Sequence, residues 1–401
     1  MPPQSIQKPK RLRYLTVLRP SENIEQPQAT DNTVALVKLV TEIGPDIAEI
    51  SRRLGQFKES VRYRYKEKLV RRGFAIKAEP DYSALGLRRI VMKLGVSEEF
   101  SAHAPKIFEA MGDLSYLVAY AGTMPNGVFL AQAAVPVEFT AEFHRFMGGL
   151  EERGVFSSVE LFDCDVHRVA PMRAECFDFD DGVWDFDWSN PPPLDERAAR
   201  ATASERKRVD KVDLLILKEL SKDSDRSLME IQAAIKRING VDINYKTLGW
   251  HYARHVLDQH LVSHHSVGWH RLNYDFEREE DVGFARYDYL GVALLVRDLK
   301  GQEGMMLRSQ INRLPFLWSE AAGVSYFSQL FIPLSMVNEA LEHFKKVLKP
   351  FGDRAELLLL DKREMKYFTI CYNQWDEPNE RWAFATEELL ARLEESVLKV
   401  R

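Results

Sequence analysis

The stretch KESVRYRYKEKLVRRG, residues 58–73, concentrates positive charge in a chain whose formal net charge is -5. Seven of its side chains are basic and two are acidic. Val61, Tyr65 and Leu69 recur every four residues, which is the spacing of a buried stripe on an amphipathic helix. Tyr63 points nearly opposite to that stripe, among the cations. A block of one charge sign with this periodicity predicts a helix that docks on a core and presents a basic face to a partner.

Two further helices are predicted before this stretch, over residues 32–43 and 47–54. Asp46 can cap the second of them, because an aspartate side chain accepts the free amide hydrogens of a first helical turn. Gly55 then ends it, and a short turn leads into the basic helix. Three short helices with a tight turn before the third are typical of a helix-turn-helix, whose third helix enters the DNA major groove. The residues that follow alternate like a strand, which suits a wing.

The segment IAEISRRLGQFKESVRYRYKEKLVRRGFAIKAEPDYSALGL, residues 47–87, is similar to the N-terminal domain of the leucine-responsive and asparagine-synthase regulator family (Lrp/AsnC). The matching features are the helix IAEISRRLG, Ser60, Arg64, Gly73 and the turn from Asp81 to Gly86. The resemblance implies a winged helix that binds DNA in a transcriptional regulator.

The chain contains an internal duplication. The helical pattern restarts after residue 209 with VDLLILKEL, SLMEIQAAIKRI and YKTLGWHYARHVLDQHL. When residues 58–74 are laid over residues 245–261, the buried positions match, and the outward Tyr63 falls on Trp250. We therefore expect a second winged helix in the second half of the chain.

The segments after each winged helix also correspond. Residues 88–163 and 287–361 each follow the order strand, helix, strand, strand, helix, strand, which is the ferredoxin-like arrangement. This is also the order of the effector domain in the family that the chain resembles. The predicted fold class is α+β, a tandem repeat of a winged helix-turn-helix and a ferredoxin-like (βαββαβ) domain.

The expected domain organisation follows from this repeat. It comprises a basic N-terminal arm (1–30), a first winged helix-turn-helix (31–82), a first ferredoxin-like domain with an aromatic and acidic tail (83–188), a linker (189–208), a second winged helix-turn-helix (209–275), a second ferredoxin-like domain (284–382) and a C-terminal helix (383–401).

The residues expected to contact DNA lie on the outward faces of the two third helices. They are Lys58, Glu59, Ser60, Arg62, Tyr63, Arg64, Lys66 and Arg71 in the first half, and Lys246, Thr247, Trp250, His251 and Arg254 in the second. The two faces differ in charge. Residues 52–77 carry ten Lys or Arg and two Glu, whereas residues 244–271 carry three Lys or Arg, one Asp and six histidines. Because phosphate neutralisation dominates DNA affinity, the first helix should bind more strongly at neutral pH. The second should strengthen as its histidines protonate below about pH 6.5.

Two of those histidines have a spacing that can chelate zinc. His251 and His255 are four residues apart on a predicted helix. No cysteine lies near them in sequence, and Asp258 is the nearby carboxylate. We interpret the segment as a polar helix that faces DNA or an interface, and we predict no metal and no cofactor.

The composition excludes several other classes of protein. The three cysteines, Cys164, Cys176 and Cys371, are not spaced like metal ligands and fit a reducing compartment without disulfides. No apolar run approaches the ~20 residues that span a bilayer, and no apolar signal-peptide core follows the N-terminus. We expect a cytoplasmic protein that does not contact membranes.

Enzyme motifs are not recognised in the chain, which carries no Gly-rich phosphate loop, G-x-S-x-G or HExxH. The siroheme decarboxylases, however, share the resemblance and can be fused in tandem. Their His-Asn-Tyr signature is not found in the corresponding runs, residues 114–122 and 316–330. We expect a non-enzymatic, sequence-specific DNA-binding transcriptional regulator. The alternatives are a siroheme-decarboxylase-like tandem enzyme and a protein-interaction scaffold.

The expected partner is double-stranded DNA. The ferredoxin-like domains should pair, either within one chain as a pseudo-dimer or between two chains as a homodimer. Relatives in the resembled family bind a small molecule near a Gly-x-Tyr-Asp-Tyr-like turn. The matching segments here, residues 121–129 and 322–330, depart from that pattern, so a small-molecule effector is left open without support.

Overall fold

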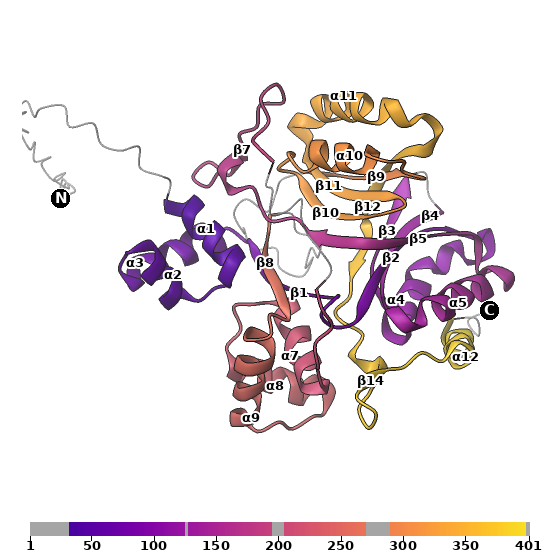
Figure 1. The fold of residues 1–401 in the computed structure, drawn as a ribbon, viewed down its shortest axis with the longest axis horizontal. Coiled ribbons are helices and arrows are strands. Elements are labelled where there is room, and N and C mark those ends of the chain that lie inside the picture. Colours follow the sequence, from indigo (N-terminus) through magenta and orange to yellow (C-terminus); the bar gives the residue numbers. More distant parts are fainter. Residues whose placement is uncertain (1–31, 125–126, 195–203, 270–288, 398–401) are drawn as a thin grey trace, which may run out of the picture.

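Figure 1 shows the computed structural model, which describes residues 32–124, 127–194, 204–269 and 289–397. The first half contains α1 (Asn32–Ile43), α2 (Ile47–Leu54), α3 (Lys58–Tyr65), η1 (Lys66–Val70), β1 (Ala75–Pro80), β2 (Leu87–Val96), α4 (Ala104–Leu114), β3 (Leu117–Met124), β4 (Val128–Pro136), α5 (Thr140–Glu152), β5 (Phe156–Val169), β6 (Phe177–Asp178) and β7 (Val183–Trp184). The second half contains α7 (Lys211–Lys222), α8 (Leu228–Asn239), α9 (Tyr245–His251), η5 (Tyr252–Leu257), β8 (Val262–Gly268), β9 (Tyr289–Val296), α10 (Glu303–Ile311), β10 (Leu317–Gly323), β11 (Tyr326–Pro333), α11 (Val337–Leu348), β12 (Ala355–Tyr367), β13 (Trp375–Asp376), β14 (Arg381–Trp382) and α12 (Thr386–Val397). The expected N-terminal arm, part of the linker, His270 and the expected boundaries at 275 and 284 lie outside the described residues.

The two ferredoxin-like domains join into one closed barrel. Its strand order is β10-β11-β9-β12-β3-β4-β2-β5, so each half contributes four neighbouring strands. At one seam β5 pairs with β10, where Arg168 lies opposite Glu320 and His167 opposite Ala321. At the other seam β12 pairs with β3. Unpaired edge strands expose backbone donors and acceptors. Closure of the barrel pairs these strands, so neither four-stranded sheet has an open edge. The α+β fold class, with winged helices and ferredoxin-like domains in tandem, is confirmed.

The wings of the two winged helices pair with each other. Strands β1 and β8 form a two-stranded antiparallel sheet in which Ala78 lies opposite His265 and Glu79 opposite His264. Each half supplies a single wing strand, since β2 enters the barrel. An isolated strand leaves its backbone donors and acceptors unpaired, so the two single strands satisfy one another. The pairing places the wings beneath the barrel between the two sets of helices (Figure 1).

The hydrophobic core crosses between the halves. One cluster joins Leu36 and Ile50 of the first winged helix to Phe344 of the second ferredoxin-like domain. The other joins Leu217 of the second winged helix to Phe143 of the first ferredoxin-like domain. Each winged helix therefore packs with the opposite half of the chain.

Local sequence signals explain the helix limits. The Asp46 carboxylate accepts the amides of Ala48 and Glu49 at 3.0 and 3.1 Å, as the sequence predicts for a cap. Gly55 ends α2 with φ of 62°, a left-handed conformation that suits glycine. These caps fix the turn from which α3 departs.

The third helix of each winged helix is shorter than the sequence predicts. Instead of one helix over residues 58–73, α3 ends at Tyr65 and continues as the wider π-type turn η1. The second half repeats this pattern with α9 followed by η5. A wider turn re-phases the side chains that follow it, because the rotation per residue changes.

The aromatic tails fold as short hairpins, β6–β7 and β13–β14. Trp184 and Trp382 are buried in them, and Trp382 Nε1 donates to the Leu85 carbonyl at 2.8 Å. All three cysteines are free and buried. None of the described helices has the length and apolar character needed to cross a membrane.

Candidate functional site

A cavity of about 1600 Å³ lies where the paired wings meet the barrel. Its walls come from α1, β1, the start of β2, the end of β5 and its following loop, β8 and the segment after α10. Nine of its lining residues are basic or can become so: Lys38, Arg88, Arg89, Arg168, Arg173, Arg206, His167, His260 and His264. Ligand pockets usually measure about 300–1,000 Å³, so this one could hold a large ligand.

Four of these side chains form an inner cationic cluster: Arg89, His167, Arg168 and His264. Arg89 is only 8% exposed, and its guanidinium carbon lies 3.9 Å from the centre of the Tyr82 ring. Its Nε has no hydrogen-bond partner. Among the described residues it forms no ion pair, and its charge acts on the buried carboxyl of Glu79. Arg168 differs, since its Nε donates to Glu320 at 2.7 Å. His264 Nε2 is also buried without a partner. Unpaired buried donors of this kind fit a site built for an anion.

The electrostatics of the inner cluster keep its histidines neutral. Burial, followed by the charges of Arg89 and Arg168 and by His264, holds the pKa of His167 well below its usual value. Burial, followed by His265 and Arg168, lowers the pKa of His264 to about 4. An anionic ligand would reverse these effects, because an opposite charge favours the protonated imidazole.

The acidic residues of the cavity are already engaged, mostly toward the rim. Asp165 accepts from Arg88 at 2.7 Å, and Glu138 pairs with Arg206 at 3.4 Å. Glu79 accepts from the Ser266 hydroxyl at 2.6 Å, and burial raises the pKa of its carboxyl. Of the described residues in the inner cluster, Arg89 is therefore the cation that forms no ion pair.

The residues predicted to contact DNA lie elsewhere, on the third helices. Lys58, Glu59, Ser60, Tyr63, Lys66, Arg71, Lys246, Thr247, Trp250 and Arg254 are exposed, and Arg62 and Arg64 are half-buried. Tyr63 is 68% exposed and Trp250 54%. Some of the positive charge is compensated, since Arg62 pairs with Glu59 at 2.6 Å and Arg71 with Glu67 at 2.6 Å. None of these residues lines the cavity.

The structure corrects the prediction that His251 contacts DNA. It is 8% exposed, and its Nδ1 lies 2.9 Å from Asp213 of α7, so it faces the helix core rather than DNA. The expected gain of charge on the second face below about pH 6.5 is also wrong for the wing. His264 and His265 are largely buried, and burial lowers the pKa of each to about 4. They remain neutral through that pH range.

Sequence reasoning missed the inner cluster. The available signal was the presence of charged residues inside barrel strands, Arg88-Arg89 in β2 and His167-Arg168 in β5. Charges rarely occupy buried strand positions without a partner. The members come from β2, β5 and β8, and the pairing of β2 with β5 and of β1 with β8 brings them together.

Comparison with known proteins places the fold. No family model matches the chain, and no curated protein matches it. Among solved structures, siroheme decarboxylase NirDL matches with a TM-score of 0.51 and 13% identity, covering 90% of this chain and 100% of that one. The same enzyme in complex with an iron-uroporphyrin III analogue matches at 0.51 and 12%. E. coli AsnC matches 33% of this chain at a TM-score of 0.23. The chain therefore shares the overall fold of siroheme decarboxylase NirDL, and in this chain winged helices and ferredoxin-like domains occur in tandem.

This comparison corrects the expectation that the chain is not an enzyme. Two solved structures that match 90% of the chain are of a decarboxylase. The lack of familiar catalytic motifs in the sequence is therefore no ground for excluding catalysis by this architecture.

Proposed function

We propose that the cavity binds a porphyrin-like tetrapyrrole bearing several carboxylates, and that the chain removes carbon dioxide from its side chains. The observation that carries this proposal is the buried Arg89, which forms no ion pair among the described residues, beside His167, Arg168 and His264 in a cavity of about 1600 Å³. Support comes from the fold, which resembles that of siroheme decarboxylase NirDL in complex with an iron-uroporphyrin III analogue.

The lining fits the two parts of such a ligand. Carboxylates pair well with arginine, whose planar guanidinium can donate two parallel hydrogen bonds. Six Lys and Arg side chains surround the cavity, enough to meet several carboxylates on one ring. Met172, Val262, Leu314 and Leu317 supply apolar surface for the macrocycle. The ring would also exclude water from the cluster and so strengthen its charge interactions.

The chemistry requires a proton donor. When a carboxymethyl group loses carbon dioxide, the bond between its two carbons breaks and the electron pair stays on the side-chain carbon. That carbon then takes a proton and becomes a methyl group, so no oxidant or reductant is consumed. His264 and His167 are suited to deliver the proton, since a bound carboxylate raises the pKa of each imidazole and promotes proton uptake on binding. This donor would come from β8 or β5, because the corresponding β3 and β10 runs carry no histidine.

The test uses the purified full-length chain with siroheme or iron-uroporphyrin III. We expect a shift of the ligand's main visible absorption band on binding. We also expect products in the mass spectrum that are lighter by whole carbon dioxide units. His264→Gln should bind the ligand but form product slowly, and His103→Gln, on the turn before α4, serves as the matched control. Absence of binding would overturn the proposal, and binding by the wild-type chain without product would overturn the reaction.

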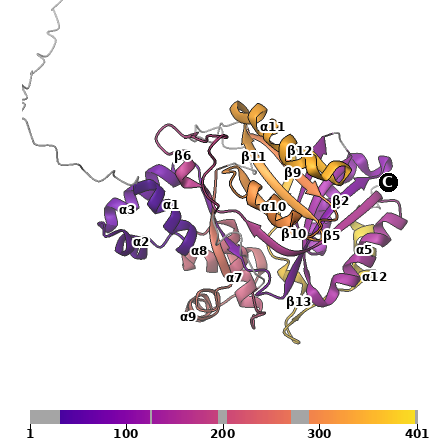
Figure 2. The same cartoon turned by 45° about the horizontal axis from the view of Figure 1, so that its top comes forward.

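DNA binding by α3 is the second candidate function. The observation that favours it is the exposed face of this helix, where Tyr63 is 68% exposed and Lys58 and Lys66 point to solvent. In both views α3 lies at the outer end of the molecule, away from the barrel (Figures 1 and 2). A surface of this kind can reach a DNA groove while the cavity is occupied. The two proposed functions are thus compatible in one molecule.

Salt dependence tests this second candidate. The logarithm of DNA affinity should fall linearly with the logarithm of salt concentration, by about 0.9 per phosphate contact. Replacing Arg62 and Lys66 together by Ala should reduce that slope by about two. The control is the double substitution of Arg145 and Lys345, which are exposed on α5 and α11. An unchanged slope in the first variant would remove α3 from any DNA interface.

A further inference from the structure

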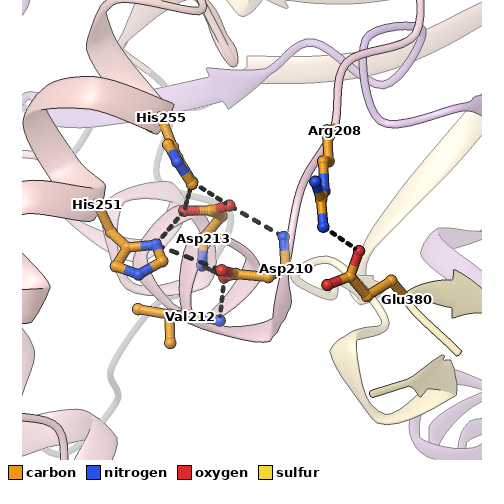
Figure 3. A network of polar contacts seen from close by, with 7 residues as sticks. All are labelled: Arg208, Asp210, Val212, Asp213, His251, His255 and Glu380. Atoms are coloured by element: carbon orange, nitrogen blue, oxygen red, sulfur yellow. Dashed lines mark hydrogen bonds and ion pairs between the residues drawn. The ribbon is translucent and has the colours of Figure 1, made fainter. Parts of the chain in front are cut away.

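Two histidines and two aspartates converge in the second winged helix (Figure 3). Asp210 caps α7, Asp213 lies in its first turn, His251 ends α9 and His255 follows in η5. One ligand atom from each of the four lies within 4.8 Å of the others. This group is separate from the cavity lining.

The distances among these atoms are those of ligands that share one ion. Nδ1 of His251 lies 2.9 Å from Asp213 Oδ1, and Nδ1 of His255 lies 2.9 Å from Asp213 Oδ2. Nδ1 of His251 lies 3.6 Å from Asp210 Oδ2. Four ligands at ~2.0–2.1 Å from a tetrahedral zinc ion are separated by roughly 3.3 Å, within the observed spread.

The surroundings hold the carboxylates in place. Asp210 Oδ1 accepts the amides of Val212 and Asp213 at 2.9 and 3.1 Å, which leaves Oδ2 directed toward His251. Asp213 is fully buried, and its Oδ2 accepts the Asp210 amide at 3.0 Å. Outer hydrogen bonds of this kind orient metal ligands and tune their affinity. Two imidazoles that both direct Nδ1 at one buried carboxylate give a compact set of nitrogen and oxygen donors.

We infer that Asp210, Asp213, His251 and His255 bind a divalent transition metal of the zinc class. Imidazole nitrogens select such metals over calcium or magnesium, which prefer oxygen. The first winged helix could not bind a metal at the equivalent place, because Arg64 and Lys68 occupy the positions of His251 and His255. The inference stands apart from the proposed decarboxylation and does not depend on it.

The metal would join α7 to the third helix of this winged helix. The start of α7 is also tied to the β13–β14 hairpin, because Arg208 pairs with Glu380 at 2.7 Å (Figure 3). Lys211 also pairs with Glu377 of this hairpin, at 3.1 Å. The site would therefore fix both the helix-turn-helix and its contact with the second aromatic tail. Its role is structural, with all four positions of the ion filled by protein.

The test is a metal titration of the chelator-treated full-length chain with Zn²⁺ against a coloured competitor. We expect one ion per chain. Asp213→Asn and His255→Gln should each raise the Kd at least about tenfold, since even outer-shell changes cost 10–100-fold. His103→Gln, outside the cluster, should leave the Kd unchanged. Circular dichroism of each variant checks that it is folded.

A second measurement covers variants that fail to fold. With Co²⁺ bound, X-ray absorption of the wild-type chain should report a shell of four nitrogen and oxygen ligands that includes imidazole. A sulfur ligand, a shell of water alone, or no stoichiometric binding would overturn the inference. So would a Kd that is unaltered in both folded variants.

Discussion

At the scale of single residues, the comparison of Arg89 with Arg168 distinguishes a functional cation from a structural one. Arg168, on the adjacent strand β5, is neutralised by Glu320 and also donates to Asn312. Arg89 is as deeply buried but has the Tyr82 ring and an unpaired Nε instead. Removing a charge from water costs several kcal/mol unless it is paired, so its burial calls for an anionic partner.

Arg89→Gln tests this assignment. We expect tetrapyrrole affinity to fall about 10- to 100-fold, because a hydrogen bond to a charged group contributes roughly 1.5–3 kcal/mol. The free protein should be no less stable, since the substitution removes an unpaired buried charge. Absorption titration with iron-uroporphyrin III measures the affinity, and Arg145→Gln on the exposed face of α5 is the control. Equal affinity in the two variants would place the ligand outside the inner cluster.

At the scale of elements, β8 is unusual for a wing strand because it supplies two largely buried histidines. It brings His264 to the cavity and His265 against Gly44, where an added Cβ would lie only 2.7 Å from the imidazole. Burial lowers the pKa of each histidine to about 4, below the usual value of 6.5. The folded chain thus binds fewer protons than the unfolded chain between these values. The stabilising effect is complete above about pH 6.5 and is lost as the pH falls toward 4.

The wing should therefore respond to acid in a defined window. Each of the two histidines should cost up to about 1.4 kcal/mol of unfolding free energy per pH unit between pH 6.5 and 4. Thermal unfolding of the ligand-free chain at a series of pH values measures this. His265→Gln should flatten the pH dependence, whereas His103→Gln should not. A wild-type curve that is flat across this window would mean that the imidazoles are hydrated.

At the scale of the whole molecule, the two halves form one interlocked body. The barrel is closed by strand pairs between halves, and each winged helix packs with the opposite ferredoxin-like domain. Separate heads that bind DNA as independent fragments are hard to reconcile with this arrangement. Each fragment would expose two strand edges and half of a core.

Fragments 1–194 and 204–401 test this interlocking. Expressed alone, each should self-associate or aggregate rather than form a compact monomer, because its open edges and apolar face need a partner. Co-expressed, the two should purify as a one-to-one complex with the tetrapyrrole affinity of the intact chain. Size-exclusion chromatography with light scattering distinguishes the species. A folded monomer of either fragment would contradict the crossed core.

The sequence by itself determined the elements and their repetition. Caps such as Asp46 and Gly55, and the strand and helix periods of the βαββαβ segments, depend on neighbours within a few residues, so they can be predicted locally. The outward position of Tyr63 and Trp250 follows from the same helical period. His251 was misplaced, because its partner Asp213 lies on another helix and a helical wheel does not include it.

Only the tertiary structure decided the candidate sites. Arg89, His167 and His264 come from three strands, and they meet because β2 pairs with β5 and the wings pair across the halves. Such contacts join segments that lie far apart in the sequence, and no local period encodes them. The same holds for the proposed metal site, where Asp213 joins His251 and His255 from 38 and 42 residues away. The physical reason is common to both sites: burial and long-range pairing, rather than local propensity, set the charge environment of these side chains.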